Sequence, residues 1–274
     1  MAKTRSLTKN LMIAAAAAAA APVAAQWLDY PTDGVPRNAD GSANLSAPAP
    51  RTPDGKTDFS GIWVSATLLP EGCGGDCIEQ MPLPADAVDF GRTVEGGLPL
   101  QPWAAALAAR RTADQSKDDP HARCLPPNFP RAYSFPQYKR VVQTPALLVF
   151  LHEFNASYRQ IHLDGRPLPR DPEPTWNGYA TAHWERDTLV IESVGYRDEL
   201  WLDLLGHPLT SRARITERMT RPSYGTLGIE VTVDDPGAYT RPWTAKLEQS
   251  IVLDTDIMDQ VCLENEKSVR NMDP

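Results

Sequence analysis

Histidine and carboxylate side chains gather in the second half of the sequence, where most strand-like segments lie. Four of the five histidines fall there: His152, His162, His183 and His207. A neutral imidazole near pH 7 can move a proton, and a neighbouring carboxylate can orient it. The predicted catalytic residues of this kind are His152, Glu153, Asp164 and His183. A hydrogen-bonded or surface role explains each histidine as well, and the His-Glu-x-x-His motif is absent. We therefore expect no metal site and no cofactor.

The faces that these side chains occupy depend on one predicted hairpin. Residues 147–154 and 158–163 are expected to pair as antiparallel strands across the loop 155–157. Because side chains alternate along a strand, a loop of this length places four residues on one face. They are Phe150, His152, Gln160 and His162. A loop one residue shorter would instead put His152 and His162 on opposite faces.

Aromatic side chains in loops between the strands form a second candidate site. Trp176, Tyr179 and Trp201 could stack on an aromatic ring or a sugar, although packing within the core explains them equally well. Together with Gln160 and His162 they are the predicted ligand-binding residues.

Charged residues at alternate strand positions have two interpretations. Guanidinium groups on one face could clamp a carboxylate or phosphate, and Arg159, Arg212 and Arg214 are candidates. More often such a pattern is the polar outer face of a barrel strand, paired with Glu or Asp. We expect the outer face. Asp164 likewise precedes Gly165 in a typical turn sequence.

The chain has four cysteines, Cys73, Cys77, Cys124 and Cys262. An even number in an oxidising compartment indicates two disulfides, for which three connectivities exist. One connectivity closes Cys73 onto Cys77 across a Gly-Gly turn and joins Cys124 to Cys262. That second bridge would tie the end of the chain to its middle.

The N-terminal sequence has the pattern of a signal peptide for export. A basic start containing Lys3, Arg5 and Lys9 precedes an alanine-rich apolar stretch that is too short to cross a bilayer. Small residues at Val23-Ala24-Ala25 then suit signal-peptidase cleavage near Ala25. We predict a soluble protein that is periplasmic or secreted.

The charge of the mature chain limits its partners. Removing residues 1–25 takes away three basic residues and no acidic one, so the formal net charge of −8 becomes −11. Binding to nucleic acid requires clustered Lys and Arg, so a nucleic-acid partner is not expected. Membrane insertion is not expected either, because no later segment has the length of a transmembrane helix. A small-molecule ligand or substrate is the expected partner.

The elements that must position these residues are mainly strands. Residues 1–25 are assigned to the signal peptide, 26–57 to a disordered tether rich in Pro and Ala, and 58–274 to one domain. One helix is expected from Pro102 to about Lys117, because proline suits the first helical position. The later strands include 243–253, with 257–262 following. We predict an antiparallel, lipocalin-like β-barrel of about 8–10 strands, with a two-sheet sandwich as the alternative.

A set of short motifs is shared with a known group of proteins. The motifs are Asp58-Phe59-Ser60-Gly61-x-Trp63, Cys124-Leu125-Pro126-Pro127, Asp164-Gly165-Arg166-Pro167, Trp184-Glu185-x-Asp187-Thr188-Leu189-Val190 and Tyr239-Thr240-Arg241-Pro242-Trp243. From about residue 51 to residue 267 the chain resembles a large, uncharacterised family of exported bacterial proteins. Arg186 stands where such proteins usually have Gly. The resemblance implies export and a single domain, and it implies no reaction.

Two functions from different classes fit these observations. The leading prediction is an extracytoplasmic barrel that binds an apolar or aromatic small molecule. The alternative is a cofactor-independent enzyme, a lyase, isomerase or hydrolase, that uses a histidine–carboxylate pair in the cavity. Serine hydrolases and NTPases are not expected, since neither a Gly-x-Ser-x-Gly elbow nor a phosphate-binding loop is present.

Overall fold

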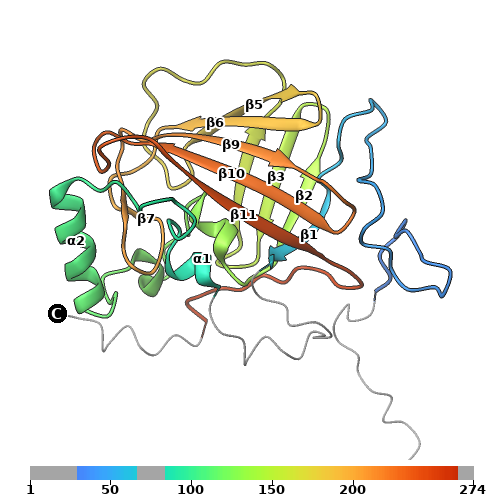
Figure 1. The fold of residues 1–274 in the computed structure, drawn as a ribbon, viewed down its shortest axis with the longest axis horizontal. Coiled ribbons are helices and arrows are strands. Elements are labelled where there is room, and N and C mark those ends of the chain that lie inside the picture. The colour runs from blue at the N-terminus through green and yellow to red at the C-terminus, as the bar shows by residue number, and fades with distance from the viewer. Residues whose placement is uncertain (1–29, 67–83, 265–274) are drawn as a thin grey trace, which may run out of the picture.

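The computed structural model describes residues 30–66 and 84–264 (Figure 1). The predicted signal peptide and the predicted Cys73–Cys77 pair therefore lie outside the described residues. The described chain forms one closed β-barrel, and the longest helix, α2 (Pro102–Ala113), lies outside the barrel wall. A barrel, rather than a two-sheet sandwich, is thus the observed architecture.

Nine strands make up the barrel in the described part of the chain. They are β1 (Gly61–Ser65), β2 (Lys139–Gln143), β3 (Leu147–His152), β4 (Ser157–His162), β5 (Tyr179–Glu185), β6 (Thr188–Val194), β9 (Arg214–Thr220), β10 (Thr226–Asp234) and β11 (Trp243–Val252). They close in the order β1-β11-β10-β9-β6-β5-β4-β3-β2. The short strands β7 (Leu200–Trp201) and β8 (Pro208–Leu209) pair separately. The predicted strand at 257–262 is wrong, since this stretch carries only an isolated bridge at Gln260.

Alternating hydrophobicity explains why these segments curl into a barrel. In β10 the side chains of Leu227, Ile229, Val231 and Val233 are buried, while the residues between them are partly exposed. One apolar face per strand is what a sheet needs to enclose a core on itself.

The hairpin of β3 and β4 has a different register from the predicted one. His152 pairs with Ser157, and Phe150 pairs with Arg159, so the connecting turn has four residues, 153–156. Asn155 and Ala156 adopt the left-handed backbone conformation that lets the chain reverse there. Relative to the pairing that the predicted loop 155–157 implies, β4 is shifted by three positions, and an odd shift exchanges the two faces of a strand. His152 therefore faces the barrel interior, whereas Gln160 and His162 face away from it.

One pair of neighbouring strands departs from the predicted antiparallel arrangement. β4 and β5 run parallel, and only Ile161 and His162 of β4 pair with β5, opposite Ala180 and Thr181. The connection 163–178 leads from the end of β4 to the start of β5, which lies beside it. In the described part of the chain, residues 157–160 of β4 have β3 on one side and no paired strand on the other.

The interior of the barrel is filled by side chains. The segment 128–135, which we call the plug, contributes Phe129 and Tyr133, both fully buried. Their ring centroids lie 5.0 Å apart, and each lies 5.4 Å from the ring of Phe150 on β3. The Gln249 side-chain amide of β11 donates to the Tyr133 carbonyl at 3.1 Å. A packed aromatic core thus occupies the space in which a lipocalin-like barrel would hold its ligand.

The predicted helix is confirmed, with an earlier end. α2 (Pro102–Ala113) starts at the proline, but Gln115 and Ser116 take positive φ angles of 57° and so end the helix before Lys117. A shorter helix, α1 (Ala85–Val88), precedes it. The 3₁₀ helices η3 (Pro120–Arg123) and η4 (Arg131–Ser134) lead into the barrel.

The described part of the segment predicted as a tether makes hydrogen bonds with the barrel. Residues 30–57 contain two isolated bridges, Arg37 with Ala43 and Arg51 with Thr57. The carbonyls of Leu45 and Ala47 accept hydrogen bonds from Gly225 and Tyr224 of the barrel, respectively. Within the described ranges, no helix is both long and apolar enough to cross a bilayer.

Candidate functional site

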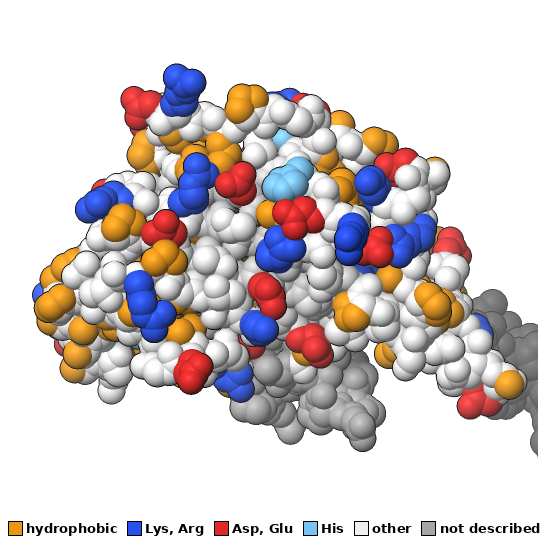
Figure 2. All heavy atoms as spheres, turned by 45° about the horizontal axis from the view of Figure 1, so that its top comes forward, with side chains coloured by type: hydrophobic (Ala, Val, Ile, Leu, Met, Phe, Trp, Pro, Cys, Tyr) orange, Lys and Arg blue, Asp and Glu red, His pale blue; other side chains and the backbone are white. Residues whose placement is uncertain are grey.

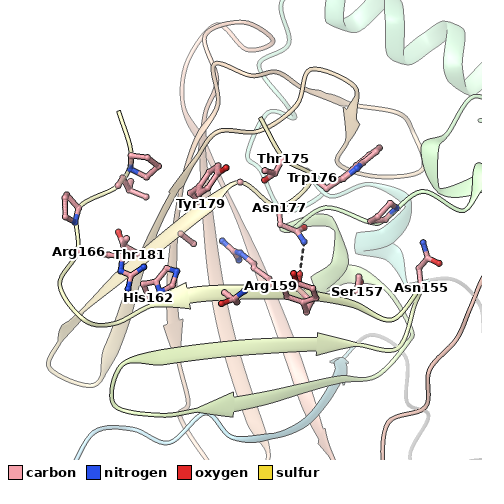
Figure 3. Close-up of a pocket in the computed structure, with 18 of the residues that line it drawn as sticks. Asn155, Ser157, Arg159, His162, Arg166, Thr175, Trp176, Asn177, Tyr179 and Thr181 are labelled. Carbon is pink, nitrogen blue, oxygen red and sulfur yellow. Dashed lines mark hydrogen bonds between the residues drawn. The ribbon is translucent and has the colours of Figure 1, made fainter. Parts of the chain in front are cut away.

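A cleft runs along the unpaired edge of β4 (Figure 3). It has a volume of about 860 Å³, which lies within the ~300–1,000 Å³ typical of small-molecule sites. It is lined by Pro126, residues 155–160, His162, residues 166–169 and residues 175–181. The cleft therefore lies between the first half of β4, the proline-rich connection and the start of β5. It opens at the side of the barrel.

Four of the five predicted ligand-binding residues line this cleft: Gln160, His162, Trp176 and Tyr179. The fifth, Trp201, is only 2 % exposed and does not line it. The Arg111 guanidinium lies 4.2 Å from the Trp201 ring centroid, a cation–π contact that secures α2 against β7. Trp201 thus has a packing role.

The aromatic side chains of the cleft include two that remain open to solvent. Tyr158 is 58 % exposed and Tyr179 is 38 % exposed. Trp176 is partly buried against the core, and the Arg197 guanidinium lies 5.0 Å from its ring centroid. Tyrosine rings with one face free offer a planar apolar surface and a hydroxyl group together.

Asn177 bridges the gap that β5 leaves beside β4. Its side-chain amide donates to the Tyr158 carbonyl at 2.9 Å, and its side-chain oxygen accepts from the Phe129 N–H at 3.1 Å (Figure 3). The next residue, Gly178, has a φ of +64°, and a Cβ there would lie 2.7 Å from the Val194 carbonyl oxygen. Glycine is therefore required for the backbone to hold Asn177 over the edge of β4.

The lining of the cleft carries cationic groups and no carboxylate, although the chain as a whole is acidic. Its basic residues are Arg159 and Arg166, with His162 beside them. The Arg166 guanidinium donates to the Asp164 carboxylate, at 2.6 Å for the shortest bond. In Figure 3 Arg166 and His162 lie together at one end of the cleft, and Asn155 lies at the other end.

Arg159, which we expected on the outer face of the barrel, instead belongs to a buried polar network. Both it and Glu217 of β9 are almost fully buried, and the Arg159 Nη2 atom lies 2.6 Å from Glu217 Oε1. The Arg159 Nη1 atom donates at 3.0 Å to Glu217 Oε2 and at 3.0 Å to the Tyr133 hydroxyl. Ser193 and Tyr196 complete the network, with their hydroxyl oxygens 2.6 Å apart.

The network fixes the protonation states of its members. Burial alone would lower the pKa of Arg159, but the Glu217 carboxylate raises it above the ordinary value of an arginine. Burial and the same carboxylate raise the pKa of Tyr133 well above its usual value. Its hydroxyl therefore stays protonated and donates a hydrogen bond to Glu217. A turn of four residues, 153–156, places Arg159 on the buried face of β4, so the correct turn length would have predicted its position.

The structure does not bring the four predicted catalytic residues together. His152 is buried, and its Nδ1 accepts from the Phe154 N–H at 3.1 Å. The Glu153 carboxylate accepts from the backbone N–H groups of Tyr138 and Met258, a structural role at a strand end. Asp164 is bound to Arg166, and exposed His183 lies 3.5 Å from Glu185. No two of the four form a proton-transfer pair.

Lys139 pairs with His152 in the barrel wall and is itself buried. Its Nζ donates to the carbonyls of Phe135 and Gln137 at 3.1 and 3.2 Å. Burial lowers the pKa of Lys139 from 10.5 to about 7. Burial, aided by the charge of Lys139, also lowers the pKa of His152 well below its usual value. Neither side chain lines the cleft.

The lowered pKa of Lys139 predicts a pH-dependent stability. Below about pH 7 the folded and unfolded chains both hold this proton, and the cost of burying the charge is fully present. As the pH rises toward 10.5, only the unfolded chain keeps the proton, so the folded state gains up to ~1.4 kcal/mol per pH unit. Between pH 7 and 9, wild type should therefore gain roughly 2 kcal/mol relative to Lys139→Met in urea unfolding. Exposed Lys246→Met is the control, and equal pH profiles for the two variants would contradict the assignment.

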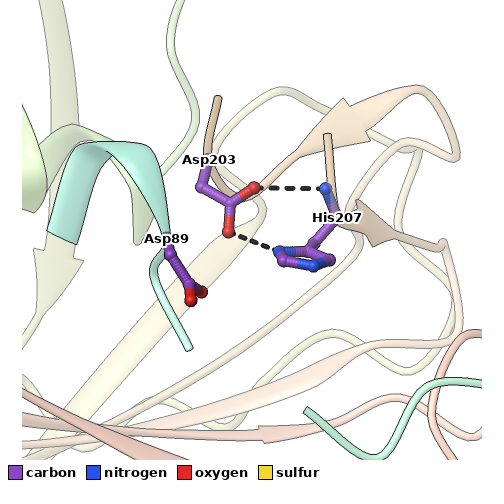
Figure 4. A group of neighbouring side chains, drawn as sticks. All are labelled: Asp89, Asp203 and His207. Atoms are coloured by element: carbon purple, nitrogen blue, oxygen red, sulfur yellow. Dashed lines mark hydrogen bonds and ion pairs between the residues drawn. The ribbon is translucent and has the colours of Figure 1, made fainter. Parts of the chain in front are cut away.

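A buried histidine–carboxylate pair does exist, between Asp203 and His207 (Figure 4). Asp203 Oδ2 lies 2.6 Å from His207 Nδ1 and also accepts from the Phe90 N–H at 3.0 Å. Asp89 lies beside this pair, with one ligand atom of each residue within 4.8 Å of the others. These contacts tie the turn between β7 and β8 to the end of α1. None of the three residues lines the cleft.

Acidic and basic side chains alternate over the face of the barrel shown in Figure 2. Exposed ion pairs join neighbouring strands, such as Arg218 with Glu185 at 2.9 Å and Arg214 with Glu192 at 3.5 Å. These pairs place opposite charges next to each other, so this face has no extended area of one sign. Arg214, one of the arginines considered for an anion clamp, is thus paired with a carboxylate on the neighbouring strand.

A disulfide joins Cys124 to Cys262, as one of the predicted connectivities required. The Asn155 side-chain amide donates to the Cys124 carbonyl at 2.7 Å, and Asn155 lines the cleft. The bridge thus holds the end of the described chain against the segment that frames one end of the cleft. A disulfide is consistent with an oxidising compartment.

Comparison with protein-family models, with curated proteins and with solved structures gives no match for this chain. The resemblance of its motifs to exported bacterial proteins stays a prediction. A function for this protein is therefore inferred from the geometry of the cleft.

Proposed function

We propose that this protein is an extracytoplasmic binding protein that holds a small molecule with an aromatic or apolar group in the cleft beside β4. The observation that carries the proposal is the convergence of Tyr158, Trp176 and Tyr179 with polar side chains around one open volume of about 860 Å³. Apolar surface with a few placed polar groups is the usual composition of a ligand site. The export-type N-terminus and the disulfide support the location outside the cytoplasm.

The site differs from that of a lipocalin. The plug fills the barrel interior, so the ligand would bind at the side of the barrel, where the wall is open between β4 and β5. The backbone around the cleft is held by Asn177, by Gly178 and by the disulfide, which favours a largely preformed site.

The proposal predicts a loss of ligand affinity when the exposed tyrosines are removed. The probe is N-phenyl-1-naphthylamine, a neutral aromatic dye whose fluorescence rises in apolar sites. Tyr158→Ala and Tyr179→Ala should each raise its Kd by about fivefold to tenfold, because each loses an aromatic contact of roughly 1 kcal/mol. The measurement is a fluorescence titration of the disulfide-bonded protein.

Trp103→Ala is the matched control, because Trp103 is 48 % exposed on α2 and does not line the cleft. Its Kd for the dye should equal that of wild type. Equal affinities of wild type and both tyrosine variants would place the dye elsewhere and reject the cleft as the site.

The alternative function is a cofactor-independent enzyme. One observation favours it, the buried Asp203–His207 pair, in which the carboxylate orients the imidazole as in acid–base sites. The cleft, however, contains neither residue. For this reason binding is the function that the geometry supports better.

A further inference from the structure

A second hollow lies next to the cleft, along the same connection between β4 and β5. It has a volume of about 660 Å³ and is lined by residues 168–172, Pro174, residues 194–196 and residues 211–214. Leu168 and Pro169 line both the cleft and this hollow. A molecule seated against these two residues can therefore contact both.

The lining of the second hollow is basic. Its charged side chains are those of Arg170, Arg212 and Arg214, with Asp171 as the one carboxylate. The chain as a whole has the opposite balance, with 27 basic and 35 acidic residues. Guanidinium groups around one volume repel one another, and a bound anion removes that repulsion.

Two of these guanidinium groups are free to take a ligand. Within the described ranges, the side chains of Arg170 and Arg212 are exposed and make neither a hydrogen bond nor an ion pair. The carboxylate of Asp198, near this hollow, accepts from the Ser211 N–H at 2.7 Å. That hydrogen bond uses an acid that could otherwise neutralise the neighbouring arginine.

The other arginines around the two hollows already have carboxylate partners. Arg159 is bound to Glu217 in the barrel interior, and Arg166 is bound to the adjacent Asp164. Arg214 has a weaker contact, at 3.5 Å, with a glutamate of β6. The positive charge that no acidic side chain neutralises therefore lies in the second hollow.

The register of the sheet brings the cleft and the second hollow within reach of one ligand. Tyr179 of β5 lies opposite Val194 of β6, and Ser193 lies opposite Ile215 of β9. Continuing the second register by one residue places Val194 beside Arg214, and residues directly opposite each other share a face of the sheet. Because neighbouring strands lie ~4.8 Å apart, the Cα atoms of Tyr179 and Arg214 are separated by about 10 Å.

The Tyr179 ring lies at the border between the two hollows. A Cβ at Gly195 would lie 2.9 Å from Tyr179 Cδ2 and 2.7 Å from Pro172 Cγ. Tyr179 lines the cleft, whereas Gly195 and Pro172 line the second hollow. An aromatic group that contacts the Tyr179 ring is thus next to the basic lining.

We propose that the ligand of the cleft is an organic acid. Its aromatic or apolar part contacts Tyr179, and its carboxylate or phosphate group binds Arg170 and Arg212 in the second hollow. This inference rests on the proposed function and names the chemical class of its ligand. Guanidinium groups bind the oxygens of either anion through charge-assisted hydrogen bonds, which a neutral analogue of the ligand cannot accept with the same strength.

The first test compares naphthalene compounds with and without a negative charge. 2-Naphthoate and 2-naphthamide form one pair, and 2-naphthyl phosphate and 2-naphthol form the other. Each compound competes with N-phenyl-1-naphthylamine for the disulfide-bonded protein near neutral pH. At least one acid should bind about fivefold to tenfold more tightly than its neutral partner, and the pair with the larger ratio identifies the preferred anion. Equal competition within both pairs would overturn the inference.

A double variant locates the anion. Arg170→Gln/Arg212→Gln should reduce the preference for the acid to less than about twofold, with the Kd for the neutral dye unchanged. Since neither side chain has a partner in the described structure, the variant is expected to fold as wild type does. Arg218→Gln is the control, because Arg218 is bound to Glu185 and lines neither hollow. It should keep the full preference.

The outcomes separate this inference from the proposed function. A preference that persists in the double variant but disappears in Arg166→Gln would place the anion at the end of the cleft, and the assignment to Arg170 and Arg212 would be wrong. If wild type binds the dye but does not distinguish acids from neutral compounds, the proposed function stands without the inference. If wild type does not bind the dye at all, the proposed function itself fails.

Discussion

Replacing Glu217 with leucine is expected to lower the free energy of unfolding by about 3–5 kcal/mol, the largest effect of any single substitution considered for this barrel. The Arg159 guanidinium makes two hydrogen bonds to the Glu217 carboxylate, and both side chains are fully enclosed. Without the carboxylate, the cation stays in the barrel interior with the Tyr133 and Ser193 hydroxyls as its remaining hydrogen-bond partners. Urea unfolding followed by tryptophan fluorescence measures the loss.

The double variant Arg159→Met/Glu217→Leu is the informative control. Removing both charges exchanges an ion pair for apolar side chains of similar size, so most of the stability lost in Glu217→Leu should return. Two equal losses would show that packing, not the unpaired charge, explains the single variant. Exposed Glu192→Leu, which breaks the surface pair with Arg214, should cost less than about 1 kcal/mol.

Removing the Cys124–Cys262 disulfide should have the second large effect. The bridge closes a loop with a sequence separation of 138 residues. By the chain-entropy relation, a loop of that length stabilises the fold by about 5 kcal/mol, and measured losses for native disulfides are roughly 2–5 kcal/mol. The double variant Cys124→Ser/Cys262→Ser should therefore unfold at clearly lower urea concentration than wild type.

The same variant also tests whether the disulfide affects the affinity of the cleft for the dye. Asn155 donates to the Cys124 carbonyl at one end of the cleft, while the contact of Asn177 with β4 lies nearer its middle. At temperatures where the variant remains folded, its Kd for N-phenyl-1-naphthylamine should change by less than about threefold, because the tyrosine contacts do not depend on the bridge. A loss of stability below about 1 kcal/mol would contradict the role assigned to the disulfide.

The β-barrel was predictable because the residue pattern of the individual segments indicates strands joined by short turns. Hairpin-forming segments follow one another from residue 139 onward, and alternation as regular as that of Leu227, Ile229, Val231 and Val233 indicates a half-buried strand. Pro102 marked the start of α2 for a similarly local reason. Four residues that line the cleft, Gln160, His162, Trp176 and Tyr179, were predictable as well, because they lie on strands or in loops beside strand ends.

The inward face of β4 was not predictable, because alternation defines two faces without saying which is buried. The chain Tyr158-Arg159-Gln160 contains polar side chains on both faces, so the length of the preceding turn decides, and a turn of three or four residues is compatible with the sequence. The partner of Arg159 lies on β9, so no local pattern could connect it with Glu217. The true histidine–carboxylate pair, Asp203 with His207, was missed because it stands in a turn outside the barrel strands.

The parallel contact between β4 and β5 follows from the number of strands in the barrel. The barrel strands follow one another around the ring in chain order, and each connection reverses direction except one. Nine is an odd number, so up and down cannot alternate all the way round a closed ring, and one adjacent pair must point the same way. The cleft lies at that unavoidable mismatch. A relative with one strand more or fewer could restore full alternation, and it would then be expected to lack the cleft at this place in the wall.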